Sequence, residues 1–131
     1  MILIAAVFLL SLPTDSFLSA ALARLRGESL AVDPPVSHIG HGVLREQREF
    51  EIEVRNYTDR PIRILGGGAD CFCVTTRDLP ITVPQQQARR ITIIATFAGA
   101  FGVGQQVFRL YTDDETQPVV IARYTRRLVP E

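Results

Sequence analysis

The sequence has no tryptophan and no lysine, and it holds only two histidines, two cysteines and one methionine in 131 residues. Its 14 basic residues are all arginine and are balanced by 14 acidic residues. The chain therefore lacks the net positive charge that holds a phosphate backbone, and we expect no nucleic-acid partner. Its length suits one domain with a single core.

The shortage of histidine also argues against catalysis. A nucleophilic site needs a base and an orienting acid beside the nucleophile, and His38 and His41 both lie near the start of the chain. No nucleophile elbow is present, and Gly66-Gly67-Gly68 lacks the Lys-Ser/Thr pair and the helix of a phosphate-binding loop. We expect no enzyme and no cofactor, and we interpret the glycine triplet as a flexible bend between strands.

Residues 1–27 are predicted to form an apolar, helical leader in two pieces, "MILIAAVFLLSL" and "FLSAALARL", with a polar interruption between them. A run this short, followed by small residues at Ala21 and Ala23, is typical of a cleaved secretory signal. Joined from Ile2 to Leu25, the two pieces reach the ~20 residues of a membrane anchor. A third interpretation is a cytosolic protein with a fortuitous apolar start. The first two place residues 28–131 in the periplasm or cell envelope, secreted or anchored to the membrane.

Residues 28–131 are predicted to form one all-β domain. "EFEIEVRN" and "RRITIIATF" alternate between apolar and polar residues with the period of a half-buried strand. The expected inward-facing residues are Phe50, Ile52, Val54, Ile91, Ile93, Ala95 and Phe97.

The remaining segments complete a sandwich. "RPIRILG", "CFCVTT" and "PITV" are short and β-branched, "GQQVFRLYTD" and "PVVIARYTRRL" form a hairpin across "DETQ", and "SLAVDP" with "VSHIG" gives a broken first strand. About seven short strands with no room for crossover helices predict an Ig-like antiparallel β-sandwich. The core tryptophan and the widely spaced cysteine pair of true Ig domains are absent.

Four short motifs occur in a fixed order. They are Phe50 or Ile52 with Val54 and Asn56, then Pro61 with Ile64, then Asp70-Cys71-Phe72-Cys73-Val74-Thr75, then Val83-Pro84. In this order the sequence resembles a bacterial family of uncharacterised Ig-like envelope proteins with a Ser-Cys-Gly-Cys-Thr motif. The chain departs from that motif at Asp70 and Phe72, and has Gln85 where the family usually has glycine.

The resemblance covers roughly Val32 to Arg127 and implies a fold similar to the Hydin-type (ASH) and major-sperm-protein domains, which are interaction modules. It implies no enzymatic activity. We therefore expect an exported or membrane-tethered protein-binding or structural module, whose partner is another envelope protein. A strand or linker of that partner would add to an open sheet edge through backbone hydrogen bonds.

The cysteines carry the alternative function. In an extended strand Cys71 and Cys73 would have Cα atoms almost 7 Å apart, which disfavours a disulfide and places both thiols on one inner face. We expect two buried, unbridged thiols and no metal. The alternative is a redox or copper-handling pair, in which Cu(I) would take both thiolates and an imidazole of His38 or His41. The flanking glycines make solvated loop residues the simpler interpretation of the histidines.

Overall fold

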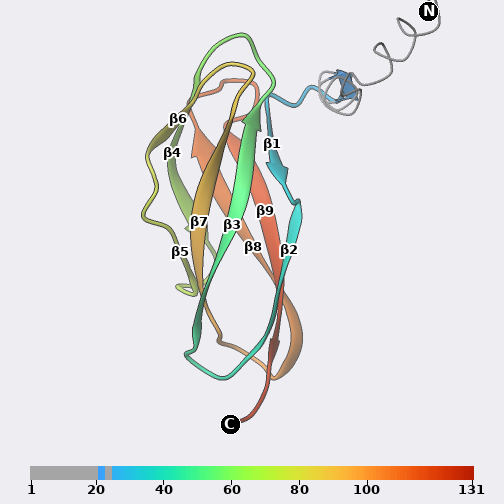
Figure 1. Cartoon of the computed structure of the whole chain (residues 1–131), viewed down its shortest axis with the longest axis vertical. Coiled ribbons are helices and arrows are strands. Elements are labelled where there is room, and N and C mark those ends of the chain that lie inside the picture. Colours follow the sequence, from blue (N-terminus) through green and yellow to red (C-terminus); the bar gives the residue numbers. More distant parts are fainter. Residues whose placement is uncertain (1–20, 23–24) are drawn as a thin grey trace, which may run out of the picture.

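The computed structural model of the chain describes residues 21–22 and 25–131. In this part nine strands form two sheets that pack face to face (Figure 1). Most of the predicted leader, residues 1–27, lies outside the described residues. No helix within the described part is long and apolar enough to cross a bilayer. The Ig-like β-sandwich predicted from the sequence is confirmed.

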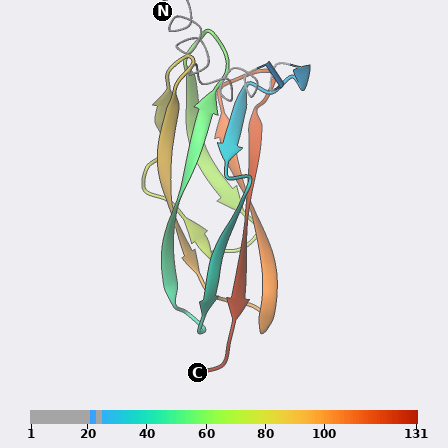
Figure 2. The same cartoon turned by 45° about the vertical axis from the view of Figure 1, so that its right-hand side comes forward.

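The first sheet has four strands in the order β1 (Leu30–Asp33), β3 (Gln47–Asn56), β7 (Ala88–Thr96) and β5 (Val74–Thr75). The second sheet has five strands in the order β2 (Val36–Gly42), β9 (Val119–Leu128), β8 (Gly102–Thr112), β4 (Ile62–Ala69) and β6 (Ile81–Val83). In the turned view, β3 and β7 lie on one side of the sandwich and β8 and β9 on the other (Figure 2).

The broken first strand is present and passes from one sheet to the other. β1 pairs antiparallel with β3, and after two prolines β2 pairs with β9 in parallel. The prediction of a purely antiparallel sandwich is therefore wrong at this edge. A crossover helix is needed only where parallel neighbours follow one another in the chain, and β2 and β9 lie near its opposite ends.

The two alternating segments form the centre of the first sheet. β3 and β7 pair along nine positions, with Phe50 opposite Ile93 and Ile52 opposite Ile91. The predicted inward-facing residues are buried, except that Phe50 is half-buried. The phenyl ring of Phe50 lies 5.4 Å from the ring of Tyr124, centroid to centroid, and 6.5 Å from the ring of Phe108. These aromatic contacts join the two sheets across the core.

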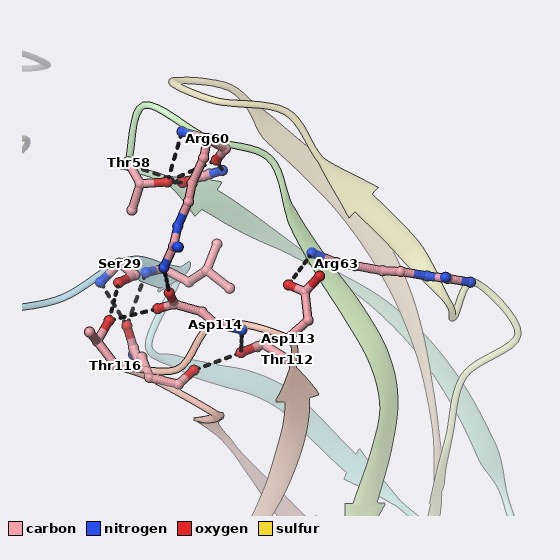
Figure 3. A network of polar contacts seen from close by, with 11 residues as sticks. Ser29, Thr58, Arg60, Arg63, Thr112, Asp113, Asp114 and Thr116 are labelled. Carbon is pink, nitrogen blue, oxygen red and sulfur yellow. Dashed lines mark hydrogen bonds and ion pairs between the residues drawn. The ribbon is translucent and has the colours of Figure 1, made fainter.

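The predicted hairpin of β8 and β9 is also confirmed, with pairs from Gly102 opposite Leu128 to Tyr111 opposite Val119. Its connecting loop carries Asp114, whose buried carboxylate forms an ion pair with Arg60 and accepts a hydrogen bond of 2.9 Å from Thr116 (Figure 3). Ser29 lies 3.0 Å from the Thr116 hydroxyl, oxygen to oxygen. This network ties three loops together at one end of the sandwich.

Two middle segments differ from the prediction. The glycine triplet belongs to β4 and is not a bend, because β4 continues to Ala69 against β8. The segment "CFCVTT" supplies only the two residues of β5, and both cysteines precede it in a turn. The described residues form nine strands instead of about seven, because the broken first strand counts as β1 and β2 and because β5 and β6 are separate fragments of two and three residues.

Candidate functional site: the open edge of β4

The sequence-predicted candidate residues lie in two separate places. His38 and His41 are exposed residues of β2, not of a loop, and Nδ1 of His38 lies 2.5 Å from the Thr125 hydroxyl. Cys71 and Cys73 follow β4, and β9 and β8 separate β2 from β4. The structure therefore does not bring the histidines and the cysteines together. Among the described residues, no group of three or more His, Cys, Asp or Glu side chains is placed to hold a metal.

Cys71 and Cys73 are joined by a disulfide, so the prediction of two unbridged thiols is wrong. The physical reason is the local backbone. The Cys71-Phe72-Cys73 segment is a turn, which brings the two Cα atoms to 5.3 Å, within the range that a disulfide spans. The prediction assumed an extended strand, whose alternate Cα atoms are too far apart.

The disulfide turn is attached to the core on one side and open on the other. Cys73 is buried, its carbonyl accepts a hydrogen bond of 2.7 Å from the Thr96 amide, and its Sγ accepts one of 3.9 Å from the Tyr124 hydroxyl. Phe72, between the two cysteines, is fully exposed. The turn therefore holds an aromatic side chain in solvent at a fixed place beside the end of β4.

The edge of β4 that faces away from β8 is only partly covered. β6 pairs with β4 at Ile62–Ile64 alone, whereas β8 pairs with it from Ile64 to Ala69 across a bulge. Only alternate residues of an antiparallel strand exchange hydrogen bonds with a given neighbour. Some amide and carbonyl groups of residues 65–69 therefore point to an edge that no strand of the described chain occupies.

At the neighbouring edge of the first sheet, side chains form hydrogen bonds with the backbone of β7. There the Thr76 hydroxyl donates a 2.8 Å hydrogen bond to the Thr92 carbonyl, and the Asp78 carboxylate accepts one of 2.7 Å from the Thr92 amide. These two side chains cap β7 where β5 ends. In the range 25–131 no side chain forms a hydrogen bond with the backbone of residues 65–69. The two edges face each other across the sandwich, and only that of β7 is capped.

The glycines leave this edge bare. A Cβ atom on Gly67 would point inward, 3.3 Å from the Arg109 carbonyl oxygen and 3.6 Å from Leu79 Cδ1, whereas a Cβ atom on Gly66 would meet nothing within 4 Å. A Cβ atom on Gly68 would lie 3.0 Å from the Tyr111 hydroxyl, on the outer face. Another backbone can therefore approach this stretch without meeting a side chain of β4.

A cavity of about 360 Å³ opens between β4 and β5. Its floor consists of buried core residues, and its rim of half-buried apolar side chains. The floor is Ile93, Phe108 and Leu110, and the rim includes Ala69, Val74 and Leu79. Half-buried apolar side chains thus line the side of the sandwich where β4 has its free edge.

Three arginines and three aspartates lie near this edge, and the groups that form no ion pair with a described residue include two of the arginines. Arg109 lines the cavity and donates a 3.1 Å hydrogen bond to Asp70, a carboxylate that is itself largely exposed. Arg63 and Arg77 form no ion pair with the described residues. The Arg63 side chain extends away from Asp113, whose carboxylate accepts a hydrogen bond from the Arg63 backbone amide (Figure 3).

The sequence contained two hints of this edge. Three successive glycines are unusual inside a strand and often mark the close approach of another backbone. The short "PITV" run could not cover an eight-residue strand, so part of its neighbour had to stay open. The capping by Thr76 and Asp78 had no visible sequence signal, since it depends on the path of the β5–β6 connection.

Comparisons with known proteins show the fold alone. No family model matches the sequence, and no curated protein matches it. Solved structures with a similar fold include a Porphyromonas gingivalis protein of unknown function (TM-score 0.62, 14% identity, 76% of this chain, 46% of that one). They also include the human CEP192 ASH/PapD-like domain 7 (0.56, 6%, 79% and 87%) and the YadV chaperone (0.55, 9%, 79% and 52%). The chain spans about half the length of the first and third of these.

Proposed function

We propose that this chain is a protein-binding module that receives an extended segment of another protein along the free edge of β4. The observation that carries the proposal is the uncapped stretch 65–69, which lies opposite a β7 edge that side chains do cap. An open edge of this kind pairs readily with another strand. The fold likeness to ASH/PapD-like and chaperone domains supports a binding role over a catalytic one.

We further propose that the module works outside the cytoplasm, as an exported or membrane-tethered protein of the cell envelope. The apolar residues 1–27 support this location, and so does the Cys71–Cys73 disulfide, because disulfides persist mainly in oxidising compartments. A reporter that is active only in the cytoplasm, fused after Glu131, should therefore stay inactive. Active reporter would contradict the location without bearing on the binding edge.

Site-specific photo-crosslinking in cells tests the binding role. A photoreactive amino acid at Leu65, which is exposed at the free edge, should give a discrete adduct with one other protein. The matched control is the same amino acid at Arg123, an exposed residue on the outer face of β9. The proposal fails if Leu65 gives no adduct, or if Arg123 gives the same adduct with equal yield.

The alternative function, a thiol-dependent redox or copper-handling protein, requires Cys71 and Cys73 in the reduced form. In the structure both sulfur atoms are bonded to each other, and Cys73 is buried. A disulfide that closes the turn at the end of β4 has a sufficient role in holding the edge and Phe72 in place. We therefore propose that the disulfide has a structural role at the binding site and no redox role.

A further inference from the structure

We infer that the segment bound at β4 is an extended, amphipathic peptide in which apolar side chains alternate with acidic ones. This inference rests on the proposed function and adds the chemistry of the ligand. It follows from what lies on each face of the free edge, because the side chains of an added strand alternate between the two faces as those of β4 do.

The inner face of the added strand would meet apolar surface. Gly67 and Ala69 lie opposite Leu110 and Phe108, whose side chains are buried in the core. A neighbouring strand at this level places its inward-facing side chains at the cavity between β4 and β5, against the half-buried Val74 and Leu79. Small or β-branched apolar residues fit this cavity and would bury the part of Val74 and Leu79 that solvent still reaches.

The outer face of the added strand would meet a cation. Gly66 and Gly68 lie opposite Tyr111 and Arg109 on β8, and the glycines place no side chain between those residues and the free edge. Arg109 has one carboxylate partner, Asp70, which is 78% exposed and therefore easily exchanged. An outward-facing glutamate or aspartate on the added strand would take its place beside the Arg109 guanidinium.

Two flanking arginines add positive charge. Arg63 precedes the free stretch on β4, and the exposed Arg77 is next in sequence to Thr76, which lines the cavity. With Arg109 they give three cations near the edge, against the three carboxylates of Asp70, Asp78 and Asp113. Asp78 and Asp113 already accept hydrogen bonds from the Thr92 and Arg63 amides, and Asp70 pairs with Arg109. The charged groups that pair with no described residue are therefore the guanidinium groups of Arg63 and Arg77. Charge complementarity therefore favours an acidic segment over a basic one.

The first test is a titration of the ¹⁵N-labelled full chain with a blocked heptapeptide in which valine alternates with glutamate, followed by NMR. We expect chemical-shift changes centred on residues 65–69 and 74–76. The same peptide with glutamine for glutamate should bind about tenfold more weakly, the effect of losing one charged hydrogen bond. A peptide N-methylated at alternate amides, which keeps every side chain but loses backbone donors, should not bind.

Protein variants locate the site. Gly67→Val directs a side chain at the cavity and should abolish binding, whereas Arg123→Ala, on the exposed outer face of β9, should bind like the parent chain. Ala69→Leu fills the same cavity from a half-buried position and serves if Gly67→Val does not fold. Arg109→Gln should remove the preference for glutamate over glutamine while peptide binding itself persists.

Four results would contradict the inferred ligand. Shift changes at β2 or β9, equal binding of the N-methylated peptide, or equal affinity of the glutamine peptide would overturn the inferred ligand. So would the absence of binding by the valine-glutamate peptide. None of these results would remove a Leu65 crosslink in cells, so a failure of the inferred ligand chemistry is distinguishable from a failure of the binding role.

Discussion

Tyr124 on β9 donates its buried hydroxyl to Sγ of Cys73, 3.9 Å away, so the disulfide turn is joined to the centre of the core. The same ring contacts Phe50, whose centroid lies 5.4 Å away on the opposite sheet. Burial raises the pKa of Tyr124, and the nearby charge of Arg126 opposes this only in part. Tyr124 therefore stays protonated and keeps its donor at physiological pH.

The disulfide gives the first prediction. Protein purified without reductant and then denatured should take up no iodoacetamide, and after reduction it should take up one equivalent for each of its two cysteines. Alkylation of the unreduced, denatured protein at both cysteines would show that the thiols are free, as the sequence predicted, and rapid alkylation of the native protein would favour the redox or metal alternative.

Replacing both cysteines by alanine should leave the protein folded. A cross-link that closes so short a loop restricts the unfolded chain only slightly, so the free energy of unfolding should fall by about 1–2 kcal/mol in the chain-entropy account. Urea denaturation measures this change. A loss of more than twice that size would mean that the disulfide determines the fold and does not merely hold the turn.

The core gives a prediction with a matched control. Ile52 and Ile93 are fully buried on β3 and β7, so truncation of either to alanine should lower the free energy of unfolding by about 2–5 kcal/mol. Glu51, exposed on the same strand, should tolerate alanine with a change within about 0.5 kcal/mol. A larger effect at Glu51 than at Ile52 would show that the register of β3 is wrong.

Asp114 gives a pH dependence. Burial raises the pKa of its carboxyl, but hydrogen bonds from Ser29, Thr116 and Arg60 and the Arg60 charge outweigh this, so its pKa lies below the ordinary value of 3.8. The ionised group thus stabilises the fold above that value, and the contribution is lost as the pH falls through the folded-state pKa. Stability should drop more steeply below pH 4 in the parent chain than in Asp114→Asn. Parallel pH curves would contradict this role.

Asn56 gives a further prediction. It is fully buried, donates to the Arg60 and Val83 carbonyls at 2.7 and 3.0 Å, and accepts from the amide and hydroxyl of Thr58. Alanine would leave these groups unpaired, at a cost of about 1–3 kcal/mol for each buried group that finds no water. The exposed neighbour Asp59 should accept alanine with little change. Equal unfolding curves for the two variants would show that Asn56 does not hold this loop.

The parts of the fold that could be predicted are those where side-chain alternation reports burial directly. The period of two along the strands β3 and β7 predicts one buried face, and the structure confirms it, because the four residues of that face are buried. They are Ile52, Val54, Ile91 and Ile93. The apolar strands and polar tip of the last hairpin likewise define its turn. Asn56 was identified only as part of a family pattern, and its hydrogen bonds explain why that position suits asparagine.

The disulfide turn and the glycine edge could not be predicted in the same way. Cys71 and Cys73 are compatible with a strand or a turn, and the choice depends on where β4 ends, which is set by its pairing with β8. Glycine has no side chain to show a face, so Gly66–Gly68 were interpreted as a bend. Whether an edge is capped depends on contacts such as that of Thr76 with Thr92, which join residues 16 apart in sequence.

The most direct test of the open edge is amide hydrogen exchange at residues 65–69, measured residue by residue with and without saturating valine-glutamate peptide. In the free protein the amides that point away from β8 should exchange fast, and those that pair with β8 slowly. With the peptide bound, the fast set alone should become protected, because those amides gain a backbone partner. Bound peptide with unchanged exchange at these residues, or with protection centred on β2 or β9, would contradict the account.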